Sequence, residues 1–219
     1  MTTALERVTG DRKHSPSSMS TLDVLWVLYD RVLRIDPNDL DRPDRDRFLL
    51  SKGHGPAAFY AVLAAKGFID EQWLDAMGDW SSRLGYHPDR TLVPGAEIGS
   101  GSLGHGLGIG VGEALGLRAQ GYPGARVFVL LGDAELDEGS NHEAIAFAGA
   151  IGLDPLTAIV IDNQSATYGW SGGIASRFTV NGWTAATVDG RDHREIERAL
   201  LARTPGQPNV VVARVEAKS

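Results

Sequence analysis

Cysteine is missing from the 219-residue sequence, so the chain forms no disulfide, offers no thiolate to a metal and has no cysteine nucleophile. Apolar runs long enough to cross a membrane are missing too, and the start MTTALERVTGDRKH lacks the apolar segment of a secretion signal. Basic residues are outnumbered, and the net charge of −7 argues against a nucleic-acid-binding surface. We therefore expect an acidic, cytoplasmic protein that binds neither nucleic acid nor membrane.

The apolar residues that are present follow the alternation of strand and helix that is typical of an α/β protein. The predicted strands of the second half are RVFVLL (126–131), TAIVID (157–162), TAATVDG and NVVVARV. Helical patterns lie between them, and another runs from Ser20, as its cap, to Leu33. This alternation predicts an α/β fold, a doubly wound parallel sheet with helices on both faces. We expect a single domain over residues 1–219, in which residues 1–18 form a loosely ordered N-terminal segment.

Two predicted strands end in polar residues that suit a metal ion. The first strand runs into Gly132 and Asp133, and the next ends in Asp162 and Asn163. If the two strands are neighbours in a parallel sheet, Asp133 and Asn163 lie in one crevice at its carboxyl edge, where such sheets bind ligands. Hard oxygen ligands of this kind suit Mg²⁺, and a helix after Gly132 would favour an anion. Asp and Asn are also common in ordinary turns, so this pattern alone leaves both interpretations open.

Longer blocks of sequence resemble one enzyme family. The segment GDAELDEGSNHEAIAFAGAIGLDPLTAIVIDN is similar to the thiamine diphosphate (ThDP) motif, which closes with an asparagine about thirty residues after its opening GD. Within ThDP enzymes, DEG (137–139) and VNGW (180–183) resemble transketolases. LSKGHGPAAFYAVLAAKGF and YHPDRTLVPGAEIGSGSLGHGLGIGVGEAL resemble two further transketolase blocks in the same order. The resemblance covers most of residues 13–215 and implies the ThDP-binding fold, in its PP-type domain that holds the cofactor diphosphate and Mg²⁺.

The resemblance also implies roles for individual residues. Mg²⁺ would be held by Asp133, Asn163 and the backbone carbonyl of Ser165. The residues matching the family's cofactor-binding positions are His54, Gly101, Ser102, Leu103, Gly132, Asp133, Ala134, Glu138 and Asn163. The residues matching its catalytic positions are His14, His54, His87 and Glu138. The chain departs from the family where Ala134 replaces a glycine, and where His105 stands in place of a glutamine that is more usual.

A partner chain is implied as well. In transketolases a glutamate in a second, C-terminal domain activates the cofactor across the subunit contact, and VVVARVEAKS is where the last strand of the first domain is expected to end. We therefore expect a separate C-terminal transketolase subunit with the pyrimidine-binding domain, in a heterotetramer built on a dimer. The implied reaction transfers a two-carbon ketol unit from a ketose (phosphate) donor to an aldehyde acceptor, so the substrates would be small sugars.

We consider three other functions. One is a biosynthetic relative that delivers the two-carbon unit to an unusual acceptor, such as a carrier-protein thiol. Another is a non-catalytic subunit that uses the fold for assembly or regulation, although Asp133 and Asn163 argue against it. A nucleotide-binding domain of the Rossmann type is disfavoured, since no G-x-G-x-x-G follows a first strand.

Glycines at 104, 108, 112 and 116 are four residues apart and form one stripe if 104–119 is a helix. Each interior glycine costs about 1 kcal/mol relative to alanine, so close packing must compensate. The stripe predicts that another helix lies directly against it. That helix could belong to a second subunit or to the same chain.

Overall fold

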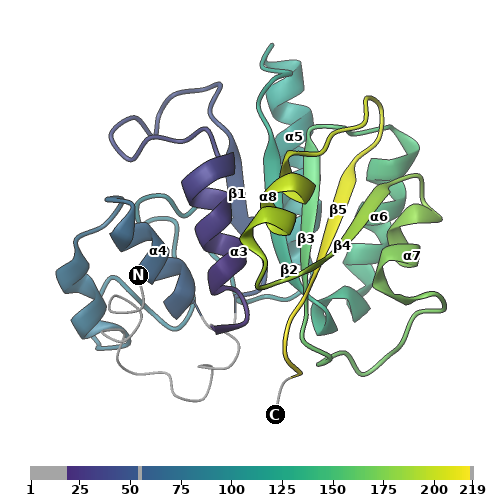
Figure 1. Cartoon of the computed structure of the whole chain (residues 1–219). Helices are drawn as coiled ribbons and strands as arrows, with labels where there is room; N and C mark the ends of the chain where they lie inside the picture. Colours follow the sequence, from purple (N-terminus) through teal and green to yellow (C-terminus); the bar gives the residue numbers. More distant parts are fainter. Residues whose placement is uncertain (1–18, 54–55, 218–219) are drawn as a thin grey trace.

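The centre of the molecule is a parallel sheet. A computed structural model describes residues 19–53 and 56–217 of the chain. Within them, five strands pair in the order β1-β2-β3-β5-β4 (Figure 1). Their bounds are β1 (Arg47–Leu50), β2 (Val127–Gly132), β3 (Leu156–Asp162), β4 (Thr184–Asp189) and β5 (Asn209–Arg214). The four strands predicted in the second half therefore occur, each within one residue of its expected start and end.

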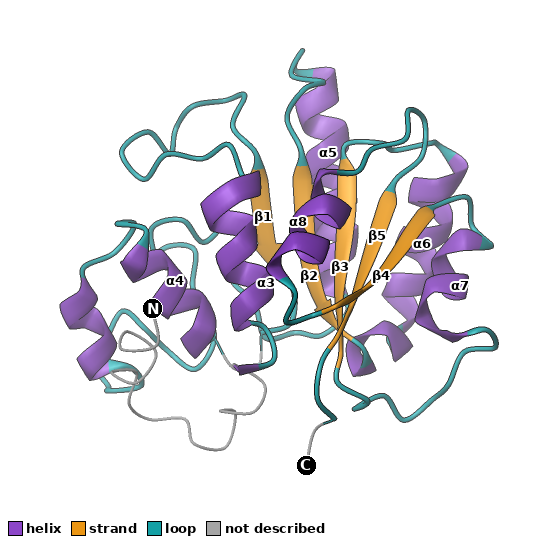
Figure 2. Cartoon of the chain, in the orientation of Figure 1, coloured by secondary structure: helices purple, strands orange, loops and turns teal. Residues whose placement is uncertain are grey.

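Helices cover both faces of this sheet (Figure 2). On one side of the sheet lie α3 (Leu22–Val27), the π-helical turn η1 (Leu28–Val32) and α8 (His193–Leu201), while α4 (Ala57–Ala65) packs against α3 and the 3₁₀ turn η2 (Glu71–Ala76) packs against α4. The other layer consists of α5 (His105–Ala119), α6 (Gly139–Ala150) and α7 (Gly173–Thr179). Figure 1 shows α3 and α8 in front of the sheet and α5 behind it. No helix in the described part of the chain is long and apolar enough to span a membrane.

The strands divide their side chains between two hydrophobic cores, because successive residues of a strand point to opposite faces. Phe128 and Leu130 of β2 join the core under α3, α4 and α8. Val127, Val129 and Leu131 join the core under α5, α6 and α7. All six residues of β2 are buried. A strand apolar on both faces is what a sheet covered on both sides requires, and the prediction of a doubly wound parallel sheet is confirmed.

Two helices differ from the sequence prediction. The helix expected directly after Gly132 is interrupted: a short 3₁₀ turn, η3 (Ala134–Asp137), comes first, Glu138 is extended, and α6 begins at Gly139. The interruption is stabilised by the Asn141 side-chain amide, which donates to the Glu135 carbonyl at 2.6 Å. At the first helix, Thr21 takes the cap position predicted for Ser20, without a side-chain capping bond. Both differences lie at the start of a helix, a boundary that apolar periodicity leaves undetermined.

Candidate functional site

The carboxyl ends of β2 and β3 lie side by side. Gly132 pairs with Ile161, and the backbone N–H of Asp133 donates to the Ile161 carbonyl at 3.1 Å. Asp133 and Asn163 follow these pairs directly and are both buried. The expectation that these two strands are neighbours is therefore correct, and it places a carboxylate and a carboxamide at one edge of the sheet.

The Asp133 carboxylate organises the loop that follows β3. Its Oδ2 accepts the backbone N–H of Ser165 at 2.7 Å and that of Ala166 at 3.3 Å. Its Oδ1 accepts the Ser165 hydroxyl at 2.5 Å and the Ala134 N–H at 2.8 Å. Four donors fill the capacity of the two oxygens, so the N–H of Ala134 is directed at Asp133. A cation on this carboxylate would have to replace one of these donors.

Asn163 provides a test of whether the site fits a cation. Its side-chain Oδ1 is buried and has no hydrogen-bond donor within the described part of the chain. Such an oxygen carries an uncompensated desolvation cost, which a positive ion would relieve. The next residue, Gln164, has a φ of 56°, an unusual conformation for a residue other than glycine and a feature found at binding sites.

The ligand types at this edge select among metals. No group of three or more His, Asp or Glu residues that could hold a metal occurs among residues 19–53 and 56–217. The oxygen atoms near Asp133 that could bind a metal belong instead to an amide side chain and to the backbone. That set suits Mg²⁺, which binds one or two carboxylates and completes its octahedron with water and phosphate oxygens. The residues present therefore fit Mg²⁺ better than a transition metal.

Three loops meet next to this point, with glycine at each contact. A Cβ added to Gly101, which has a φ of 126°, would lie 2.6 Å from Cδ2 of His87. A Cβ on Gly53 would lie 2.5 Å from the backbone nitrogen of Gly101. The backbones at Gly53 and Gly101 are thus in direct contact, and the His87 ring packs against Gly101, so glycine allows the close approach that a ligand cradle requires. The structure brings together His87 and Gly101, which the sequence had placed in one site.

Two residues that the sequence interpretation missed connect these loops. The buried Glu135 carboxylate accepts the Ser51 hydroxyl and the backbone N–H groups of Gly104 at 3.0 Å and Gly132 at 3.2 Å. Ser51 Oγ also accepts the N–H of Gly106 at 3.1 Å. Burial raises the pKa of Glu135 above its ordinary value, although the hydrogen bonds from Ser51, Gly104 and Gly132 oppose the shift. A carboxylate two residues beyond Asp133, in a segment predicted to be helical, was the only signal in the sequence.

The remaining predicted site residues occupy the rim. Glu138 is exposed, and its Cβ would lie 2.5 Å from a Cβ on Gly104. The Ser102 hydroxyl and the Leu103 carbonyl both lie 3.1 Å from Nδ1 of His105, so that histidine is bonded locally. His14 and His54 lie outside the described residues.

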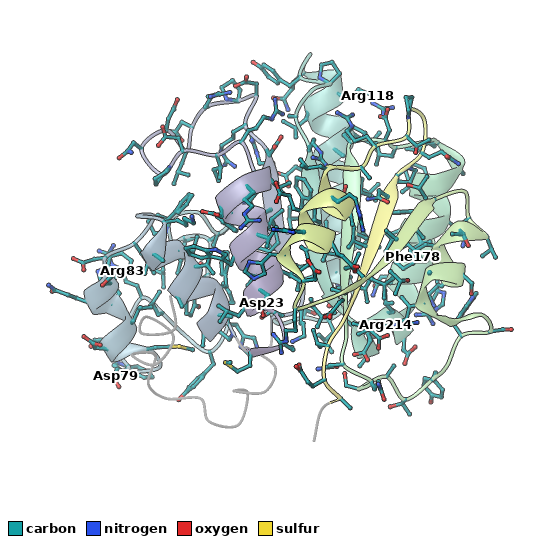
Figure 3. All side chains as sticks on the ribbon, in the orientation of Figure 1. Asp23, Asp79, Arg83, Arg118, Phe178 and Arg214 are labelled. Carbon is teal, nitrogen blue, oxygen red and sulfur yellow. The ribbon has the colours of Figure 1, made fainter. Side chains whose placement is uncertain are left out.

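A pocket of about 390 Å³ opens beside Asp133, under the loop between β3 and α7. Its lining includes Asp137, Tyr168, Trp170, Arg177 and Arg214. Arg177 fixes the loop: it donates to the Leu136 carbonyl at 2.6 Å and lies 4.8 Å from the Trp170 ring. In Figure 3, Arg214 marks the carboxyl edge of the sheet, whereas Arg118 marks the opposite edge. All the features of the candidate site gather at the edge marked by Arg214.

Comparison with known proteins identifies the class to which this fold and site belong. Residues 4–215 match the family model described as "Transketolase, thiamine diphosphate binding domain". The structure superposes on transketolase from Leishmania mexicana with a TM-score of 0.76 and 27% sequence identity, covering 90% of this chain and 35% of that one. The chain thus spans about a third of the length of this solved transketolase.

Two relatives of known name are more similar in sequence. The chain is 37% identical to an apulose-4-phosphate transketolase subunit from Actinobacillus succinogenes, over 91% of this chain and 75% of the relative. It is 54% identical to a protein named ferredoxin fas2 from Rhodococcoides fascians, over 98% of this chain and 71% of the relative. The 219 residues contain no cysteine and so cannot hold a cysteine-ligated iron–sulfur cluster.

The fold is therefore that of a ThDP-binding α/β domain. The chain belongs to the transketolase family, whose members are ThDP-dependent transferases, and it corresponds to their N-terminal, ThDP-binding part. The family resemblance expected from the sequence blocks is confirmed. Because the Actinobacillus relative is named as a subunit of its transketolase, that relative carries this part as one chain of an assembly with a partner subunit.

Proposed function

We propose that the chain is the N-terminal subunit of a two-chain transketolase that transfers a two-carbon ketol unit from a ketose (phosphate) donor to an aldehyde acceptor. The observation that carries the proposal is the buried, donor-free Oδ1 of Asn163 beside the Asp133 carboxylate at the carboxyl edge. Family membership and the relative named as a transketolase subunit support the same conclusion.

In this proposal Asp133, Asn163 and the Ser165 carbonyl hold Mg²⁺, which neutralises the cofactor diphosphate. The side chain of His54 would contact that diphosphate, which would lie beside Gly132 and Ala134, whose backbone N–H groups donate to Glu135 and Asp133. Gly101, Ser102 and Leu103 line the cofactor rings, where the absence of a Cβ at Gly101 permits close approach. ThDP, when bound, supplies the electron sink that lets a two-carbon unit be carried between sugars.

The chain's own acid–base groups would handle the sugar. His87 packs its ring on Gly101 and is exposed at the rim, so it can exchange protons with a substrate hydroxyl. His14 would act beside it on the donor. Glu138, also exposed, would contact the cofactor at the subunit contact.

The partner would be a C-terminal transketolase subunit with the pyrimidine-binding domain, in a heterotetramer built on a dimer. The outer surface of α5 and α6 has the apolar character that is expected where a protein partner binds. Ile109 is 46% exposed, Phe147 50% and Ile151 39%, and a Cβ on Gly108 or Gly112 would touch no atom within 4 Å. We call this surface, made by residues 108, 109, 112, 146, 147, 150 and 151, the α5–α6 face. Both helices begin at the candidate site, so a subunit covering this face would also border the site.

The proposal is tested by titrating ThDP with Mg²⁺ into the chain co-purified with its partner, for the wild type and for Asp133→Ala. We expect Mg²⁺-dependent binding that disappears in the variant, because the metal loses its only carboxylate. Asp189→Ala is the matched control: this carboxylate lies at the same edge, at the end of β4, and accepts the N–H of Arg191. Absence of binding to the wild-type complex would contradict the proposed function.

A further inference from the structure

The pair Ser51 and Glu135 joins three segments that are far apart in the sequence. These are the loop after β1, the loop that enters α5 and the turn after β2. Each contributes a residue to the candidate site: His54 follows Ser51, Gly101 to Leu103 precede Gly104, and Asp133 follows Gly132. The pairing of β1 with β2 holds the first and third segments side by side, whereas the loop that enters α5 belongs to no strand and needs contacts of its own.

The hydrogen bonds converge on one carboxylate. Oε1 of Glu135 accepts the Ser51 hydroxyl and the Gly104 N–H, and Oε2 accepts the Gly132 N–H. Ser51 extends this hydrogen-bond network, because its oxygen accepts the N–H of Gly106 at the start of α5. Glu135 is 2% exposed and Ser51 1%, so water does not compete for these bonds. Every partner is a donor, which is the set that an ionised carboxylate satisfies completely.

Glycine makes the arrangement possible and also rigid. A Cβ on Gly106 would lie 2.3 Å from Cβ of Ser51, and a Cβ on Gly104 would lie 2.5 Å from Cβ of Glu138. The Ser140 hydroxyl donates to the Gly104 carbonyl at 2.8 Å. The loop entering α5 is therefore held on both sides, by Ser51 and Glu135 on one and by Glu138 and Ser140 on the other.

The geometry points to Glu135, acting with Ser51, as a positioning residue that holds the three cofactor loops in their binding arrangement. This inference rests on the proposed function for the identity of the cofactor. Glu135 is buried beneath the loops and is directed at their backbone, so its effect on the ligand passes through Gly104 and Gly132. Outer groups that orient ligand-binding residues typically change affinity by about 10- to 100-fold when they are removed.

Glu135→Gln is the sharpest variant. It keeps the volume of the side chain but presents an NH₂ group to one of the donors, so one segment loses its acceptor. Ser51→Ala removes the link to Gly106 and serves as a second variant if the first folds poorly. Asn209→Ala is the matched control. Asn209 begins β5, on the opposite edge of the sheet, and its buried side chain donates to the Ala199 carbonyl.

Two measurements are made on each variant. Amide hydrogen exchange of the chain reports the loops directly: we expect faster exchange at Gly104 and Gly132 in Glu135→Gln, at Gly106 in Ser51→Ala, and at none of them in Asn209→Ala. Titration of Mg²⁺ and ThDP into the complex with the partner reports binding. There we expect a Kd about 10- to 100-fold higher for the first two variants. The KM for ThDP should rise in parallel, while kcat at saturating ThDP stays near the wild-type value.

The outcomes separate the two proposals. Unchanged exchange and unchanged Kd in Glu135→Gln would overturn the positioning role, as would an equal rise in Kd in Asn209→Ala. If exchange accelerates but Kd does not change, the loops are connected without effect on binding, and the inference is wrong. A wild-type complex that fails to bind ThDP contradicts the proposed function and leaves no cofactor for Glu135 to position.

Discussion

The two helix layers that cover the sheet differ in what they present outward. The outer side of α8 carries charged residues such as Arg194, Glu197 and Arg198, while its buried side carries Ile196 and Leu200. The outer sides of α5 and α6 carry glycine, alanine and large apolar residues on the α5–α6 face. A helix that faces water separates polar from apolar residues, whereas one covered on both sides does not. The comparison shows that the two layers differ in their outer surface, and the α5–α6 face is where we propose that the partner subunit binds.

The same contrast exists within α5, between two sets of glycines. Gly106 and Gly110 face inward, and a Cβ on Gly110 would lie 2.4 Å from Cγ2 of Val129 in the sheet. Gly108 and Gly112 face outward, and a Cβ there would meet nothing within 4 Å. Of the stripe predicted from the sequence, only Gly104 packs tightly within the described chain. Packing among the described residues therefore does not explain Gly108 and Gly112, which agrees with the partner subunit that we propose for this face.

The largest effect is expected for Gly112→Leu on assembly. A leucine side chain on the α5–α6 face would overpack a close helix contact, which costs about 3 kcal/mol or roughly a hundredfold in the Kd for the partner. The measurement is the mass and affinity of the complex by analytical ultracentrifugation. Gly124→Leu is the control, because its Cβ also meets nothing within 4 Å but lies in the loop after α5. If the Gly112 variant assembles like the wild type, the α5–α6 face is not the surface that binds the partner.

The next effect concerns stability of the chain without its partner. Gly110→Ala should lower the free energy of unfolding by about 1 to 3 kcal/mol, because the new methyl group collides with Val129. Gly112→Ala should raise it by about 1 kcal/mol, because alanine favours the helix and touches nothing. Urea unfolding of both variants measures these two changes in the free energy of unfolding. Two changes of the same sign would contradict the assignment of inward and outward faces.

A further effect is a pH dependence that comes from the partly buried Glu113 on α5. Burial, and then the charge of Glu97, raise the pKa of Glu113 from 4.5 to about 7, while Arg47 opposes the shift. The folded chain therefore binds this proton more tightly than the unfolded chain does. Its contribution is fully present below pH 4.5 and is lost as the pH rises through about 7.

For the isolated chain we expect the free energy of unfolding to fall by about 3 kcal/mol across this window because of Glu113. Unfolding in urea at several pH values measures it. Glu113→Gln stays neutral and should remove this part of the slope, so an unaltered slope in the variant would show that Glu113 does not titrate there.

Much of the fold could be predicted from the sequence. The strands β2, β3 and β5 are rich in valine, isoleucine and leucine, which a sheet covered on both faces can bury, so their positions and parallel direction could be predicted, although the strand order could not. The placement of Asp133 and Asn163 at one edge was predicted on the condition that their strands are neighbours, because parallel strands bring their carboxyl ends to one edge. The break before α6 could not be predicted, since it depends on the hydrogen bond from Asn141 to Glu135.

What the sequence determined by itself is the alternation of strands and helices, the parallel sheet and the polar residues at the strand ends. Tertiary structure alone decided which glycines of α5 meet the sheet and which stay open, because residues 106–112 of this helix are apolar all round and show no preferred inner side. It also decided that Glu135 would meet Ser51, Gly104 and Gly132. Hydrogen bonds between residues up to 84 positions apart exist only after the sheet has brought those segments to one edge, so no local pattern encodes them.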